Sequence, residues 1–219
     1  MTSLQGVIFD LDGVITDTAE YHFQAWKKLA DRIGISIDRT FNEQLKGVGR
    51  MASLERILRY GRKENDFCEA EKKKLTDWKN SEYVKMIRHI TSSDLLPGVA
   101  DFLAELKAAR IKTAIASASK NAGTILRALG IKETFDYIVD ASTVKQSKPN
   151  PEVFIRAYRG LQLPPSSCVG IEDAALGVDA ILAAGMKAIG IGNRKILGRA
   201  TLVLESTAEL TLEKVRAVF

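Results

Sequence analysis

Cysteine is scarce in this sequence of 219 residues. The two that are present, Cys68 and Cys168, lie far apart. They belong neither to a Cys-x-x-Cys motif nor to a cluster with the spacing of metal ligands. We therefore expect both thiols to be chemically inert.

Long apolar segments are missing as well. No run of apolar residues is long enough to span a lipid bilayer, and the N-terminus lacks the basic residues and apolar stretch of a secretory signal. We therefore expect a cytoplasmic protein. A hydrophobic content of 46% and a charged content of 27% exclude the disordered and fibrous classes.

Charge of one sign is not concentrated anywhere. The net charge is +5, but Lys and Arg are spread along the chain, and the one dense basic run, 72–74, stands among acidic residues at helical spacing. A mild basic excess suits a small anionic ligand such as a phosphate ester. We expect a monomer with a small-molecule ligand and without nucleic-acid or membrane partners.

The spacing of apolar residues divides the chain into two kinds of segment. From Thr18 to about Thr91 they recur with the period of a helix, as at Tyr21, Ala25 and Leu29, and no strand is evident. Beyond residue 98, helices and strands alternate. We expect helices at 99–110, 120–129, 151–161, 174–184 and near 212, and strands at 112–116, 137–139, 168–171, 187–191 and 201–204.

Strands that alternate with helices favour an α/β fold with a doubly wound, mostly parallel, Rossmann-like sheet. The short apolar run Val7–Phe9 supplies a further strand of that sheet, so the helical segment is an insertion. We expect an α/β core domain at 1–16 and 93–219 and an all-helical cap domain at 17–92. Such a cap is placed to act as a lid, hinged where it joins the core, and a rigid second domain is the alternative.

Polar residues follow the predicted strands at four places. These are Asp10-x-Asp12, Ser117-x-Ser119-Lys120, Lys148-Pro149 and Glu172-Asp173. Each alone has a structural explanation, such as a helix cap or an exposed lysine. The carboxyl ends of parallel strands meet at one edge of a sheet, where open α/β sheets bind ligands. Together the four elements therefore predict a functional site.

The residue types at that edge suit phosphoryl transfer to a carboxylate. Mg²⁺ prefers hard oxygen ligands, which Asp10, Asp173 and Glu172 offer. Lys148 and the metal can offset the repulsion between a carboxylate nucleophile and an anionic phosphate. Asp12 lies two residues after Asp10 and beside a glycine, so a turn could aim it at the attacking or leaving oxygen as general acid and base.

The strand end at Ser117 offers a site for an anion. Its hydroxyl could act together with the backbone N–H groups of the helix predicted to begin at 119–120. We expect a phosphate group to bind there.

These elements, in this order, resemble the haloacid dehalogenase superfamily of phosphotransferases over the whole chain. Within it, the segments 12–22, 44–50 and 116–121 are similar to the β-phosphoglucomutase family. The resemblance implies interconversion of β-D-glucose 1-phosphate and glucose 6-phosphate. It also implies an aspartyl-phosphate enzyme, with β-D-glucose 1,6-bisphosphate as intermediate and primer.

The resemblance also implies roles for individual residues. Asp10 would be the nucleophile and Asp12 the general acid and base, and Arg50 would bind the non-transferring phosphate bidentately. The metal ligands would be Asp10, the main-chain carbonyl of Asp12, Glu172 and Asp173. The transferring phosphate would be held by Ser117, Ala118 and Lys148. Further substrate contacts would come from Lys46, Gly47, Val48, Gly49, Ser53, Lys79, Ser119, Lys120 and Asn121.

Gly49 stands where the family commonly has serine, which implies the loss of one hydroxyl contact. His22 and Trp26 are four residues apart and share a helix face. We count both as candidate substrate contacts, although His22 could equally be an interface histidine and Trp26 a core residue.

Two other functions would use the same residues. A sugar-phosphate phosphatase would combine Asp10 and Asp12 with water as the acceptor, and the cap sequence favours the mutase over it. A phosphate-binding module or a mere phospho-acceptor would not need an acid and base at Asp12.

Overall fold

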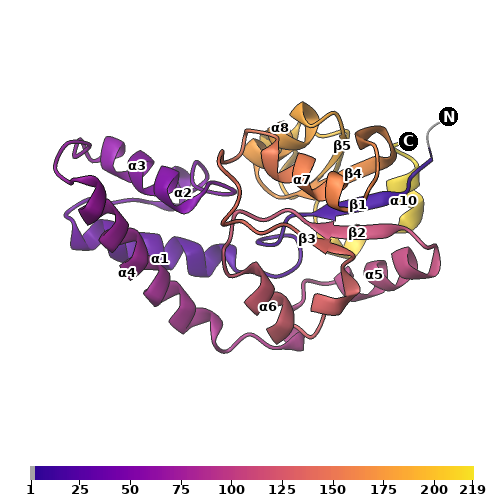
Figure 1. Cartoon of the computed structure of the whole chain (residues 1–219), viewed down its shortest axis with the longest axis horizontal. Coiled ribbons are helices and arrows are strands. Elements are labelled where there is room, and N and C mark those ends of the chain that lie inside the picture. The colour runs from indigo at the N-terminus through magenta and orange to yellow at the C-terminus, as the bar shows by residue number, and fades with distance from the viewer. Residues whose placement is uncertain (1–2) are drawn as a thin grey trace.

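The computed structural model describes residues 3–219 as a parallel sheet covered by helices, with four further helices beyond one end of it (Figure 1). The strand order is β3-β2-β1-β4-β5-β6, and every pair is parallel. The strands are β1 Gly6–Phe9, β2 Lys112–Ile115, β3 Tyr137–Ile138, β4 Cys168–Glu172, β5 Lys187–Ile191 and β6 Leu202–Leu204. This is the doubly wound order: β2 and β3 are added on one side of β1, and β4 to β6 are added on its other side. The predicted fold class is therefore confirmed.

The side chains of β1 show how the sheet is covered on both faces. Val7 and Phe9 belong to one hydrophobic cluster and Ile8 to another, because successive side chains of a strand point to opposite faces. The cluster of Val7 and Phe9 also contains residues of α5, α6 and α10, and that of Ile8 contains residues of α7 and α8. Figure 1 shows these two helical layers above and below the sheet.

The helices of the sheet domain follow the predicted order, with one further short helix at Arg194–Leu197 that was not predicted. They are α5 Val99–Ala108, α6 Ala122–Ala128, α7 Glu152–Gly160, α8 Ala175–Ala183, α9 Arg194–Leu197 and α10 Leu212–Arg216, with short 3₁₀ helices at Ser92–Asp94, Lys132–Thr134, Pro165–Ser167 and Thr207–Glu209. The regular helices are a residue or two shorter at their ends than the apolar spacing predicts, since apolar residues just outside a helix can be buried as well.

The segment between β1 and α5 forms four helices, which we call the cap helices. They are α1 Ala19–Arg32, α2 Arg39–Asn42, α3 Arg50–Tyr60 and α4 Glu69–Ile87. Residues at helical spacing on α1, among them Trp26 and Leu29, share a hydrophobic cluster with Leu54 and Ile57 of α3 that is separate from the two clusters at the sheet. The cap helices therefore have a core of their own.

The two connections between the cap helices and the sheet domain lie side by side. The hydroxyl of Thr16 donates to the carbonyl of Asp94 at 2.7 Å, and the N–H of Leu96 donates to the carbonyl of Ile15 at 3.0 Å. A β-bridge also joins Thr16 to Leu95. The chain thus leaves and re-enters the sheet domain at one place. Within residues 3–219, no helix is both long enough and apolar enough to cross a membrane.

Candidate active site

Asp10 lies directly after β1, at the point where the strand order reverses. Its backbone N–H donates to the carbonyl of Ile171 in β4 at 2.9 Å, so the two strand ends stay in register. The ammonium of Lys148 donates to Asp10 Oδ1 at 2.6 Å and to Glu172 Oε2 at 2.7 Å. All three side chains are at most 5% exposed. The ends of β1 and β4 and the loop after β3 bring these residues together, as the sequence predicts.

Asp173 completes an acidic cluster at this edge. Asp10, Glu172 and Asp173 each offer an oxygen atom, and these oxygens lie within 4.8 Å of one another. Gly13 makes room for Asp173, because its φ is +82° and a Cβ there would lie 2.5 Å from Asp173 Oδ2. From the cap side, the ammonium of Lys46 lies 3.6 Å from the same oxygen.

The buried charges at this edge do not balance without a cation. Burial raises the pKa of Glu172 well above its ordinary value and that of Asp173 to about 6, and the Asp10 carboxylate adds to both shifts. Burial opposes the charge of Lys148, but Asp10 and Glu172 raise the pKa of Lys148 above its ordinary value, so it stays protonated. Three carboxylates around one buried ammonium suit a divalent metal ion, which prefers carboxylate oxygens.

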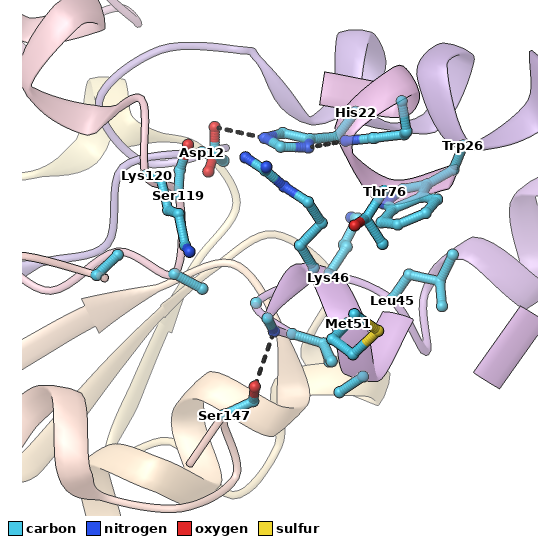
Figure 2. A pocket seen from close by; sticks show the side chains of 18 of the residues that line it. Asp12, His22, Trp26, Leu45, Lys46, Met51, Thr76, Ser119, Lys120 and Ser147 are labelled. Carbon is cyan, nitrogen blue, oxygen red and sulfur yellow. Dashed lines mark hydrogen bonds and ion pairs between the residues drawn. The ribbon is translucent and has the colours of Figure 1, made fainter. Parts of the chain in front are cut away.

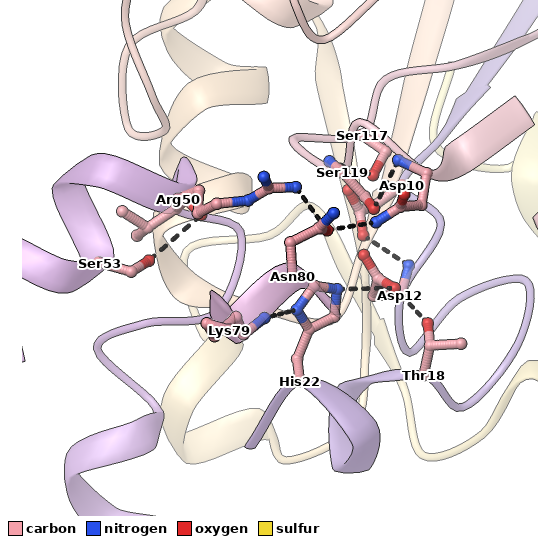
Figure 3. A network of polar contacts seen from close by, with 12 residues as sticks. Asp10, Asp12, Thr18, His22, Arg50, Ser53, Lys79, Asn80, Ser117 and Ser119 are labelled. Atoms are coloured by element: carbon pink, nitrogen blue, oxygen red, sulfur yellow. Dashed lines mark hydrogen bonds and ion pairs between the residues drawn. The ribbon is translucent and has the colours of Figure 1, made fainter. Parts of the chain in front are cut away.

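Asp12 lies where the chain turns from the sheet toward the cap helices (Figure 3). Its N–H donates to Asp10 Oδ2 at 3.0 Å, and its own carboxylate accepts from the hydroxyl of Thr18. His22 Nε2 lies 3.7 Å from Asp12 Oδ1 and makes no hydrogen bond within the described residues. Burial, and next the Asp10 carboxylate, raise the pKa of Asp12 to about 7. A carboxyl with this pKa can both release and accept a proton near neutral pH.

A buried lysine lies behind His22. Lys79, on α4, is 2% exposed, and its ammonium lies 2.8 Å from His22 Nδ1 and 4.6 Å from the centre of the Trp26 ring. Burial lowers the pKa of Lys79 to about 7, and the charge of Arg50 adds to this shift. Burial also keeps the pKa of His22 well below its ordinary value, so the imidazole is neutral.

One cavity of about 670 Å³ joins the sheet edge to the cap helices (Figure 2). It is lined by most of the predicted site residues, namely Asp10, Asp12, His22, Trp26, Lys46, Gly47, Val48, Gly49, Arg50, Lys79, Ala118, Ser119, Lys120, Asn121 and Asp173. Ser117, Lys148 and Glu172 do not line it and are buried. Ser53 is buried too, and its hydroxyl donates to the carbonyl of Val48 at 3.4 Å. The structure thus keeps Ser53 away from the cavity wall.

The loop after β2 is folded on its own hydroxyl groups. The N–H of Ser119 donates to Ser117 Oγ at 3.0 Å, and the N–H of Asn121 donates to Ser119 Oγ at 3.3 Å. Helix α6 begins only at Ala122, two residues later than predicted. The predicted anion site is therefore formed by a loop ahead of the helix.

Two side chains that were not predicted from the sequence, the amide of Asn80 and the hydroxyl of Ser147, connect the cap helices to the sheet domain. Asn80 Oδ1 accepts hydrogen bonds from Arg50 Nη2 at 2.7 Å and from Asn121 Nδ2 at 3.0 Å. Ser147 Oγ accepts from the N–H of Gly49 at 3.0 Å, and a Cβ at Gly49 would lie 2.4 Å from that oxygen. The backbone of Gly49 therefore contacts the sheet domain at a place where a side chain would meet Ser147.

Comparison with known proteins agrees with this geometry. The family model for haloacid dehalogenase-like hydrolases matches residues 4–185. The chain belongs to this family. Its fold is thus that of a haloacid dehalogenase-like protein, as the sequence motifs indicated.

Individual relatives show which members of the haloacid dehalogenase-like family this protein resembles. It is 48% identical to β-phosphoglucomutase from Bacillus subtilis over 210 residues, which cover 96% of this chain and 93% of the relative. It matches the crystal structure of β-phosphoglucomutase from Clostridium difficile with a TM-score of 0.96 and 49% identity, covering 98% and 96% of the two chains. A phosphorylated carbohydrates phosphatase from Thermotoga maritima is 29% identical, with 97% and 96% coverage. The predicted resemblance to β-phosphoglucomutase is confirmed.

Proposed function

We propose that this protein interconverts β-D-glucose 1-phosphate and glucose 6-phosphate through a phosphorylated Asp10. The observation that carries the proposal is one cavity with two different ends. Asp10 and Asp173 line one part of it, above the buried Lys148, and we call this part the acidic end. Arg50 and Lys120 also line the cavity and contribute positive charge, and we call their part the basic end. A mutase that works through a bisphosphate must hold two phosphates at once, and this cavity offers a place for each.

The acidic end would bind Mg²⁺ through Asp10, the carbonyl of Asp12, Glu172 and Asp173. The ion would supply positive charge that lets a carboxylate approach an anionic phosphate. Lys148 adds to that charge from the protein side. Its ammonium already contacts Asp10 Oδ1 at 2.6 Å.

The reaction exchanges one phosphoryl group between Asp10 and two hydroxyl oxygens of the sugar. A carboxylate oxygen of Asp10 forms a bond to phosphorus while the bond from phosphorus to the sugar oxygen breaks, and Asp12 gives its proton to that oxygen. In the return step the other hydroxyl attacks the phosphoryl group, and Asp12 takes up the proton of that hydroxyl. The return step takes place on a sugar monophosphate and yields β-D-glucose 1,6-bisphosphate, which would reorient before Asp10 attacks its other phosphate.

The loop of Ser117 and Ala118 would hold the transferring phosphate beside Lys148. Arg50 would hold the other phosphate, with help from the neighbouring loop residues. The remaining substrate contacts would come from Lys46, Gly47, Val48, Gly49, Ser53, Lys79, Ser119, Lys120, Asn121, His22 and Trp26. Among these, Ser53 has the least support, since it does not line the cavity.

Closure of the cap helices over the substrate would keep water away from the phosphorylated Asp10. Binding of the distal phosphate by the cap would contribute the energy that aligns the sugar hydroxyl instead of water. We accordingly treat 17–92 as a lid on a core formed by 1–16 and 93–219. A monomeric enzyme in the cytoplasm fits this proposal.

The deciding experiment supplies β-D-glucose 1-phosphate, Mg²⁺ and a trace of the bisphosphate, and follows the reaction by phosphorus NMR. Formation of glucose 6-phosphate is the expected result. Release of inorganic phosphate alone would instead make the protein a sugar-phosphate phosphatase. If no product formed and Asp10 did not become phosphorylated, phosphoryl transfer would be refuted altogether.

A substitution at Arg50 tests the basic end of the cavity. Arg50→Ala should reduce turnover of the sugar phosphate far more than it reduces phosphorylation of Asp10 by acetyl phosphate, which has no second phosphate. Arg59→Ala is the matched control, because Arg59 is an exposed arginine of the same helix, α3, outside the cavity. Equal losses with both donors would remove Arg50 from the distal phosphate site.

A further inference from the structure

Asn80 joins the two walls of the cavity through one oxygen atom. It lies on α4, and its Oδ1 accepts from Arg50 Nη2 of the cap helices at 2.7 Å and from Asn121 Nδ2 of the sheet domain at 3.0 Å (Figure 3). All three side chains are partly buried and line the cavity. Asn80 is thus a shared acceptor for two donors that come from opposite sides of the cavity.

One of these donors, Arg50, is the residue that the proposed function gives to the distal phosphate, and the other, Asn121, is among its further substrate contacts. A guanidinium has five N–H donors and a side-chain amide has two, so each can keep one hydrogen bond to Asn80 and offer the others to a phosphate oxygen. An unliganded arginine on a flexible stem would otherwise lose conformational freedom when it binds. A neutral acceptor can fix its direction without competing for the charge, which a carboxylate could not do.

We propose that Asn80 is a positioning residue that holds Arg50 and Asn121 ready for the non-transferring phosphate of the substrate. This inference rests on the proposed function, since it assumes that a phosphate binds between those two side chains. Through its single carbonyl oxygen, Asn80 fixes the separation of the two donors before the substrate arrives. It touches the donors and leaves their remaining N–H groups for the ligand.

Two substitutions separate this role from a merely structural one. Asn80→Ala removes the acceptor and frees both donors. Asn80→Asp keeps the shape and the acceptor, so the contact between the two walls survives, but its negative charge would pair with Arg50 and repel a phosphate. Ser81→Ala is the control, because Ser81 is an exposed neighbour on α4 whose hydroxyl bonds only to the carbonyl of Trp78 within the described residues.

Binding of β-D-glucose 1,6-bisphosphate is measured by calorimetry in the full-length Asp10→Asn protein, which cannot accept the phosphoryl group. Asn80→Ala should weaken binding about tenfold, the effect of one hydrogen bond to a charged group. Asn80→Asp should weaken it further while its thermal unfolding temperature stays at or above that of the parent protein. Ser81→Ala should bind like the parent.

The same substitutions are then placed in the protein with Asp10 intact. We compare the fold-decrease in the rate at which acetyl phosphate phosphorylates Asp10 with the fold-decrease in affinity for bisphosphate. The first should be at least ten times smaller than the second, because acetyl phosphate uses the acidic end alone.

The outcomes distinguish failure of the inference from failure of the proposed function. If the parent protein binds bisphosphate and both Asn80 variants bind it equally well, Asn80 has no positioning role. If Asn80→Asp binds as tightly as the parent while Asn80→Ala is merely unstable, the role is structural and the inference is wrong. If the Asp10→Asn parent binds bisphosphate but the protein with Asp10 intact does not form glucose 6-phosphate, the mutase proposal fails while the role of Asn80 is still measured. No binding by the parent overturns both.

Discussion

The charge of Lys79 should make the stability of this protein depend on pH in a direction that is unusual for a lysine. Lys79 is 2% exposed, its ammonium lies against the rings of Trp26 and Tyr83, and burial together with Arg50 lowers its pKa from 10.5 to about 7, although Asp12 opposes the shift. The unfolded chain therefore holds this proton more tightly than the folded protein does.

The sign and size of the effect follow from this difference. Below pH 7 both states are protonated, and the folded state bears the full cost of a buried charge, about 5 kcal/mol at 1.36 kcal/mol for each pH unit between the two pKa values. As the pH rises above 7 the folded protein loses the proton first, so the cost declines and disappears near pH 10.5. Between pH 7 and pH 9 the free energy of unfolding should gain about 2 kcal/mol from this one residue.

The measurement compares wild type with Lys79→Met by urea unfolding at pH 7 and pH 9. Methionine keeps the apolar stem and removes the titrating group, and any constant penalty from the lost contact to His22 Nδ1 cancels in the comparison between the two pH values. Lys74→Met, an exposed lysine of the same helix, should leave the pH dependence of wild type intact. If wild type and Lys79→Met differ by the same free energy at both pH values, the reasoning about Lys79 is wrong.

Four further changes probe other parts of the structure. Asp12→Ala should lower sugar-phosphate turnover about 10²-fold or more, and near-normal turnover would exclude Asp12 as acid and base. Gly13→Ala should lower the free energy of unfolding by about 1–3 kcal/mol because of the positive φ and the approach of Asp173, and unchanged urea unfolding would contradict this. Mg²⁺ should raise the thermal unfolding temperature of wild type, whereas in Asp173→Asn that rise should shrink markedly. Leu54→Ala, at a fully buried position among the cap helices, should cost about 2–5 kcal/mol, and a smaller loss in urea unfolding would mean that the cap helices repack easily.

Local pattern was enough to predict the sheet domain and its acidic edge. Val7–Phe9 is too short and too apolar for anything but a buried strand, and parallel strands must bring their carboxyl ends together, so Asp10, Lys148 and Glu172 meet as expected. Their charges and hydrogen-bonding groups follow from residue type alone. These parts of the prediction needed only the periodicity of strands and helices.

The contacts across the cavity could not be predicted in this way. Asn80 and Ser147 occupy unremarkable polar positions in the sequence, and nothing in their spacing says that they face the opposite wall. Such contacts depend on how the cap helices sit over the sheet edge, which is a property of tertiary packing. The buried position of Lys79 was missed for the same reason, since lysine at a helical position is usually solvated.

The paired connections at Thr16 and Leu96 restrict how the cap helices can be displaced. Two segments that exchange hydrogen bonds cannot slide past each other or separate without breaking them, so a displacement that preserves these bonds is close to a rotation about a single axis. One angle would then describe the whole motion. Asp12 bridges to Thr16 beside that axis, whereas Arg50 lies at the start of α3, among the cap helices. A small rotation would therefore displace Arg50 much more than Asp12. Binding of the distal phosphate at Arg50 would then be coupled to a small, proportional displacement of the proton donor Asp12.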